Sequence, residues 1–118
     1  MAAPNVVSVA TITGKTDVSA AVGNSATAVV QNATSSGNVY KVNMLLCSNI
    51  LSAAATVTVD LYRSATAYTL CKDVSIPAGA TLDVLNKAIY LEEGDDLRVT
   101  CGTASGLDVV ASYEIISE

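Results

Sequence analysis

The 118-residue chain contains no histidine, no phenylalanine and no tryptophan. Without histidine, the sequence lacks the side chain that most often serves as a general base and the commonest ligand of transition metals. Five tyrosines are the only aromatic residues, so a hydrophobic core has to be built from Val, Leu, Ile and Ala. Because β-branched residues pack well across a pleated sheet, this composition predicts an all-β chain.

Charged residues are also scarce, at 14% of the chain, and the net charge is −5. The cationic residues are scattered singly along the sequence, at Lys15, Lys41, Arg63, Lys72, Lys87 and Arg98. Proteins that bind nucleic acid usually concentrate such residues in a basic stripe, so we expect neither nucleic acid nor an anionic membrane surface as a partner. A surface with so few charges suits a protein that is largely covered by neighbouring subunits.

Long apolar runs and signal-peptide features are missing as well. No run approaches the roughly 18 apolar residues of a membrane-spanning helix. The first residues lack the positive start and the continuous apolar block of a signal peptide, so we expect synthesis in a cytoplasm.

Cysteines are few, and they are far apart in the sequence at Cys47, Cys71 and Cys101. No Cys-x-x-Cys pair is present, and a zinc site would lack its usual ligands. We interpret the three residues as buried, reduced apolar side chains, with one disulfide and a free thiol as the alternative.

Eight or nine short strands are predicted by the alternation of apolar and polar residues and by the turn signals between them. They cover residues 5–13, 25–31, 39–50, 56–63, 68–76, 81–85, 89–91, 97–101 and 107–116, with a loop expected at 14–17. Turn signals at this spacing are typical of a sandwich or barrel. We predict one domain, residues 1–118, folded as an antiparallel β-sandwich of jelly-roll or immunoglobulin-like type and built from consecutive hairpins.

Two segments carry more specific expectations. In the strand at 39–50, one face is predicted to hold Tyr40, Val42, Met44 and Leu46. The N-terminal residues 1–24 are weakly patterned, and we hypothesise that they form an extended arm that orders only on a neighbouring subunit.

The residues from Ala88 to Cys101 are predicted to form a hairpin around a tight turn at Gly94. Four carboxylates surround that glycine and are the only candidate metal ligands: Glu92, Glu93, Asp95 and Asp96. Calcium would suit such oxygen ligands, but the spacing does not match an Asp-x-Asp-x-Asp-Gly loop. A turn that stays in water and discourages edge-to-edge aggregation is the simpler interpretation.

No catalytic constellation is visible. The sequence contains no Gly-x-Ser-x-Gly motif, and Gly14-Lys15-Thr16 resembles the end of a phosphate-binding loop without its first glycine, because Val9 stands there. We therefore predict that the protein is not an enzyme and needs no cofactor. Sugar binding is an alternative, although it would need exposed tyrosines as stacking platforms.

Four segments in the last two-thirds of the chain carry a family resemblance. They are TVTVDLY at 56–62, VSIPAGATL at 74–82, IYLEEGDDL at 89–97 and VVASYEIIS at 109–117. In this order they resemble a family of small virion structural proteins of tailed bacteriophages, of the type found in phages of cyanobacteria and marine bacteria. Residues 1–38 match nothing in that family.

The resemblance implies a non-enzymatic β-sandwich subunit of the virion, made in the host cytoplasm and without catalytic residues. Its implied partners are further copies of itself, as a homo-oligomer, and other virion proteins such as the major capsid protein. We expect a capsid cement or decoration subunit that stabilises the particle by binding neighbouring coat proteins. The alternatives are a neck, connector, tail or fibre component, or a receptor- or sugar-binding module at a fibre.

Overall fold

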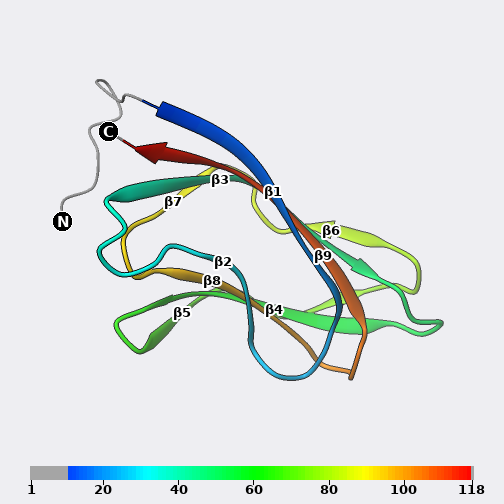
Figure 1. Ribbon diagram of the computed structural model, residues 1–118. Coiled ribbons are helices and arrows are strands. Elements are labelled where there is room, and N and C mark those ends of the chain that lie inside the picture. Colours follow the sequence, from blue (N-terminus) through cyan, green and yellow to red (C-terminus); the bar gives the residue numbers. More distant parts are fainter. Residues whose placement is uncertain (1–10, 118) are drawn as a thin grey trace.

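The computed structural model describes residues 11–117 and confirms the predicted all-β sandwich. Sheet A contains β1 (Thr11–Val22), β9 (Leu107–Ser117), β3 (Asn38–Asn49), β6 (Thr81–Asp83) and β7 (Ile89–Leu91), and both short strands pair with β3. Sheet B contains, in spatial order, β2 (Thr27–Gln31), β8 (Asp96–Cys101), β4 (Ala55–Arg63) and β5 (Thr66–Ile76). The two sheets lie one above the other in Figure 1. Residues 11–117 contain no helix that is long and apolar enough to cross a membrane.

The connections differ from the expected series of hairpins. All pairings are antiparallel, but β4 and β5 are the only consecutive strands that pair within residues 11–117. The hairpin predicted from Ala88 to Cys101 is therefore wrong. Its first strand, β7, pairs with β3 in sheet A, whereas its second strand, β8, lies between β2 and β4 in sheet B. The acidic turn thus carries the chain from one layer to the other.

The core lies between the inner faces of the sheets and consists mainly of Val and Leu, as the composition predicts. Its side chains without exposed surface include Val42, Leu45, Val57, Val59, Leu91, Leu97, Val99 and Leu107. Two tyrosines join this core, since the rings of Tyr40 and Tyr113 stack with their centroids 5.3 Å apart. Apart from this tyrosine pair, alternating aliphatic residues from the facing sheets fill the described core.

A bulge in β3 overturns the predicted face of that strand. The pairing of β3 with β9 shifts between Val42 and Met44. The extra residue, Asn43, reverses the alternation, because a β-bulge inserts one residue on one strand only. Val42 and Leu45 both point into the core, and Met44 and Leu46 point outward instead of sharing a face with Tyr40.

The predicted loop at 14–17 is also wrong, because these residues lie in the middle of β1. Thr11 to Ser19 pair without interruption with Ser117 to Val109 of β9. An edge strand needs only one partner and can keep Gly and charged residues, so the long β9 dictates its conformation. Of the arm expected over residues 1–24, residues 11–22 form β1, and residues 1–10 lie outside the described residues. The strand predicted at 5–13 overlaps β1 only at 11–13.

The other predicted strands are confirmed, with ends that agree to within two residues. β4 places Val57 and Val59 in the core, as the alternation predicts. β9 likewise places alternate residues in the core, namely Leu107, Val109, Ala111 and Tyr113. These strands are the ones with the most regular period-two pattern in the sequence.

Candidate functional site

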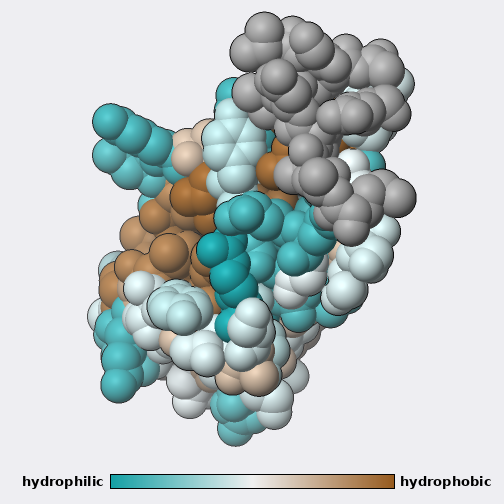
Figure 2. All heavy atoms as spheres, turned by 90° about the vertical axis from the view of Figure 1, so that its left-hand side faces the viewer, coloured by the Kyte–Doolittle hydropathy of each residue, from teal (hydrophilic) through white to brown (hydrophobic). Residues whose placement is uncertain are grey.

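The acidic turn between β7 and β8 lies at the end of the sandwich that faces the viewer in Figure 2, where hydrophilic residues border a hydrophobic area. Gly94 has a φ of 85°, the left-handed conformation that the sequence predicted there. Its backbone N–H donates to the carbonyl of Asn32 at 2.8 Å, and the Asn32 N–H donates to the carbonyl of Asp95 at 2.9 Å. The turn is therefore tied to the segment that follows β2.

Asp95 is buried, with 1% of its surface exposed. Its Oδ1 accepts a hydrogen bond from Arg63 Nε at 2.7 Å, and its Oδ2 accepts one from the backbone N–H of Glu92 at 2.8 Å. Arg63 Nη2 also donates to Oδ2, which makes the pair bidentate. This hydrogen bonding raises the pKa of the Arg63 guanidinium above its usual range. The expectation that the whole turn stays in water is wrong for Asp95.

The other three carboxylates of the turn have separate surroundings. Glu92 Oε2 accepts from Arg63 Nη2 at 2.9 Å, and Glu93 Oε2 accepts from the backbone N–H of Gly37 at 3.0 Å. Asp96 lies beyond the turn, at the start of β8. Within residues 11–117 there is no group of three or more His, Cys, Asp or Glu side chains that could hold a metal ion. Glu92, Glu93 and Asp95 brace the turn through these contacts. The described residues do not bring the four carboxylates together as calcium ligands.

Asn32 is a central residue of this region that the sequence reasoning missed. It is 1% exposed, and its Nδ2 donates to the carbonyls of Asn38 at 2.9 Å and Leu91 at 3.0 Å. Its Oδ1 accepts a hydrogen bond from Ser36 Oγ. An asparagine at the end of a strand, just before a Ser- and Gly-rich loop, is the signal that would have found it.

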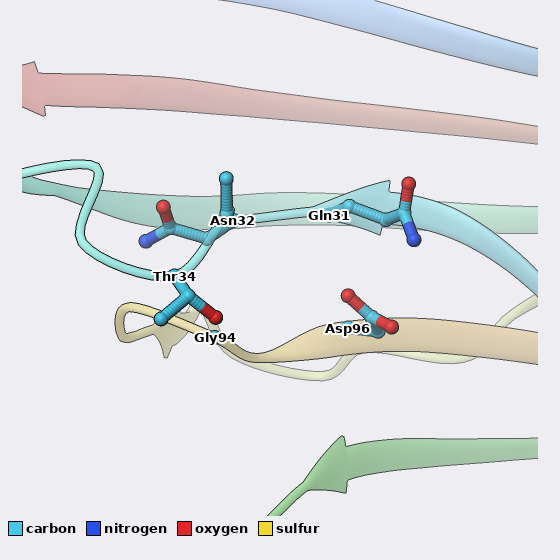
Figure 3. Close-up of a pocket in the computed structure, with 6 residues that line it drawn as sticks. Gln31, Asn32, Thr34, Gly94 and Asp96 are labelled. Atoms are coloured by element: carbon cyan, nitrogen blue, oxygen red, sulfur yellow. The ribbon is translucent and has the colours of Figure 1, made fainter.

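A hollow of about 420 Å³ lies beside the turn. It is lined by Gln31, Asn32, Ala33, Thr34, Gly94 and Asp96. In Figure 3 the side chains of Gln31 and Asp96 lie together at one side, and the Asn32 amide points away from both. The lining contains no aromatic residue and no cation, so it lacks the apolar walls with a few convergent polar groups that small-molecule sites show.

A second ion pair, in which only the carboxylate is buried, lies on the outer face of sheet B. Arg98 of β8 and Asp60 of β4 are directly opposite each other, and Arg98 Nε donates to Asp60 Oδ1 at 2.8 Å. The guanidinium also lies 4.0 Å from the ring centroid of Tyr62, which adds a cation–π contact. Both arginines of the chain are therefore held by carboxylates of the fold.

The tyrosines do not gather into a platform. Tyr40 and Tyr113 stack in the core, and the ring of Tyr62 makes a cation–π contact with the Arg98 guanidinium. Two tyrosines are exposed, and they belong to different sheets: Tyr68 lies on β5 and Tyr90 on β7. A sugar-binding face built from several neighbouring rings is not formed by these residues.

The three cysteines are free thiols. Cys47 and Cys101 are buried in the core, as the sequence suggested, and Cys71 is half-buried. Burial, together with the neighbouring Cys71 and Cys101, raises the pKa of the Cys47 thiol to about 12. Because the thiolate is the reactive form, Cys47 is a poor nucleophile at neutral pH.

The outer face of sheet A carries apolar side chains that face solvent. Val18, Val110 and Leu46 lie opposite one another across β1, β9 and β3. Thr16, Ser112 and Met44 form the neighbouring row in the same way. Val18 is 73% exposed. Four of these six residues are apolar, and the other two, Thr16 and Ser112, are small and polar. Val18 is exposed, whereas Met44, Leu46 and Val110 are half-buried. We call the six residues the outer apolar face, because exposed apolar surface marks sites that another protein covers.

Comparisons with known proteins do not identify a family. No protein-family model matches the chain, and no similar curated protein was found.

Proposed function

We propose that this protein is a non-enzymatic structural subunit of a tailed-phage particle, in which it acts as a capsid cement or decoration protein. The observation that carries the proposal is the outer apolar face of sheet A, where Val18 is 73% exposed. Apolar surface of this kind is stabilised when a neighbouring protein covers it. In the proposed role, the neighbours are coat proteins and further copies of the subunit.

The placement of the reactive side chains supports a structural role. Arg63 and Arg98 are bound to Asp95 and Asp60, and Cys47 is a buried thiol with a raised pKa. The first pair joins the β4–β5 hairpin to the turn between β7 and β8, the second joins β4 to β8 within sheet B, and the thiol packs in the core.

The mechanism of a cement protein would be the burial of surface across joints between coat proteins. A standard protein–protein interface buries about 1,600 Å² in total. The outer apolar face would supply the apolar centre of such a contact, and the cross-strand neighbours Lys41 and Glu114 would supply part of its polar rim. Repeated over many symmetry-related copies, these contacts would resist the pressure of the packaged DNA.

The first test is to quantify the protein in purified particles against the major capsid protein. Hundreds of copies per particle would support a cement protein, and a dozen or fewer would favour a neck, connector, tail or fibre component instead. Absence of the protein from particles would overturn the proposal.

The second test probes the outer apolar face itself. Val110→Asp places a charge at the centre of this face on β9, and we expect the variant to lose binding to particles that lack the protein. Thr69→Asp is the matched control, because Thr69 is exposed on β5 of the other sheet. If both variants bind as well as the unmodified chain, the outer apolar face is not the docking surface.

A further inference from the structure

The outer edge of β1 is long and regular. β1 is the terminal strand of sheet A, and within residues 11–117 no strand pairs with its outer side. From Thr11 to Ser19 its register with β9 is unbroken, so this part of the strand contains no bulge. Every second residue of such an edge presents its backbone N–H and C=O groups outward, which makes the edge a template for another strand.

The other edges of the described sheets are interrupted or short. The pairing register of β5 with β4 shifts on both sides of Val59, a residue of β4. On β5 itself, Asp73 has a φ of 50° and the neighbouring Lys72 is exposed. β2 has five residues and a register shift of its own, and β6 and β7 have three residues each. Bulges, lysines and short strands are the devices that prevent edge-to-edge pairing. From Thr11 to Ser19, β1 is neither short nor bulged, and its single lysine, Lys15, lies beside the opposite charge of Asp17.

The charges of β1 are arranged symmetrically about Thr16. Lys15 precedes this residue and Asp17 follows it, on the same side of the strand, with Lys15 Nζ 3.9 Å from Asp17 Oδ1. Asp17 Oδ2 also accepts a hydrogen bond from Tyr113 Oη at 2.7 Å, which holds the carboxylate in place. Thr16 itself is exposed on the opposite side, together with Gly14 and Val18.

We propose that two copies of this chain pair antiparallel along β1, about a two-fold axis at Thr16. Lys15 of each copy then lies directly opposite Asp17 of the other copy, so that two complementary charge pairs flank the axis. Gly14 lies opposite Val18 of the second copy, and Thr13 lies opposite its Ser19. The two A sheets become one continuous sheet, and the two outer apolar faces become one surface.

The charges select this register over its neighbours. An axis at residue 15 would place Lys15 opposite Lys15 of the second copy, and an axis at residue 17 would place Asp17 opposite Asp17. Like charges directly opposite each other destabilise a sheet, whereas opposite charges stabilise it. A two-fold contact of this kind uses the edge of both copies and closes, so it yields a dimer and not a fibre. Two isolated chains would pair in this way whatever the proposed function.

The mass of the purified full-length protein in solution tests the dimer. We expect light scattering on a sizing column to give twice the 12.0 kDa of one chain, and a monomer at all concentrations would overturn the proposal. Lys15→Asp should weaken dimerisation about tenfold, because it places like charges opposite each other on both sides of the axis. The exchange variant, Lys15→Asp with Asp17→Lys, should restore it. An exchange variant that dimerises no better than Lys15→Asp would contradict the charge pairing.

A disulfide across the axis tests the register independently. Directly opposed residues of antiparallel strands have Cα atoms about 4.5–5.5 Å apart, within the range of a disulfide, so Thr16→Cys should form a covalent dimer under mild oxidation. Gly14→Cys is the matched control: a Cβ atom at Gly14 meets no other atom within 4 Å, yet the two copies of residue 14 would be about 13 Å apart along the strands. Both variants carry Cys71→Ala to remove the half-buried thiol. Equal cross-linking of the two variants, or none, would overturn the register.

Discussion

Arg63 and Asp95 form a bidentate ion pair that joins the β4–β5 hairpin to the turn between the two sheets. Arg63 Nε donates to Asp95 Oδ1 at 2.7 Å. The two side chains differ in exposure, since 41% of the Arg63 side chain but only 1% of the Asp95 side chain is accessible to solvent. Arg63 is therefore the cation that pairs with the buried Asp95 carboxylate. This pair stabilises the turn through which the chain passes from β7 in sheet A to β8 in sheet B.

We expect Arg63→Ala to destabilise the protein by about 1–3 kcal/mol, because it leaves the buried Asp95 carboxylate without its cation. Urea denaturation would measure the loss. Glu92→Gln is the control, since the Glu92 side chain is 63% exposed and its ion pair should contribute less than about 0.5 kcal/mol. Equal effects of the two substitutions would show that burial of Asp95 does not determine the strength of the pair.

Asn32→Ala should also lower stability by about 1–3 kcal/mol, because the carbonyls of Asn38 and Leu91 lose their side-chain donor. Thermal unfolding would detect this as a drop of several degrees in Tm. The neighbouring Gln31→Ala removes an exposed amide and should leave Tm nearly unchanged. A Tm of the Asn32 variant equal to that of the unmodified chain would contradict the bracing role of this side chain.

The protein should lose stability at alkaline pH. In the folded state burial raises the pKa of Cys47 from near 9 to about 12. Burial and the hydrogen bond to Asp17 raise the pKa of Tyr113 above its ordinary value near 10. Both groups release their protons more readily when unfolded, so their contribution is complete below about pH 9 and is lost as the pH rises toward 12.

The free energy of unfolding, measured in urea from pH 7 upward, would test this prediction. It should be level up to about pH 8.5 and decline above pH 9, because the unfolded chain then binds fewer protons than the folded one. Cys47→Ala should reduce the steepness of the decline between pH 9 and 10, whatever its effect on stability at pH 7. A stability that rises over this range would show that the buried thiol does not ionise preferentially in the unfolded state.

Much of the fold could be predicted from local pattern alone. The segments 56–63 and 107–116 alternate with a period of two, and a strand with one face in the core requires that alternation whatever its partners are. The glycine at position 94 and the proline at position 77 mark chain reversals through their own backbone preferences. The all-β class, the number of strands and the aliphatic core follow from such local signals.

Other features, such as a bulge, an edge strand and a buried carboxylate, depend on contacts between segments that are distant in the sequence. The extra residue at Asn43 is visible only against the register of β9, and the strand that includes Gly14 exists because β9 pairs with it. The buried Asp95 is paired with Arg63 from the β4–β5 hairpin, and an acidic turn without that partner would remain in water. Side-chain alternation is a property of one strand and can be read from its residues, whereas pairing partners, bulges and buried ion pairs are properties of two segments, which only the tertiary structure brings together.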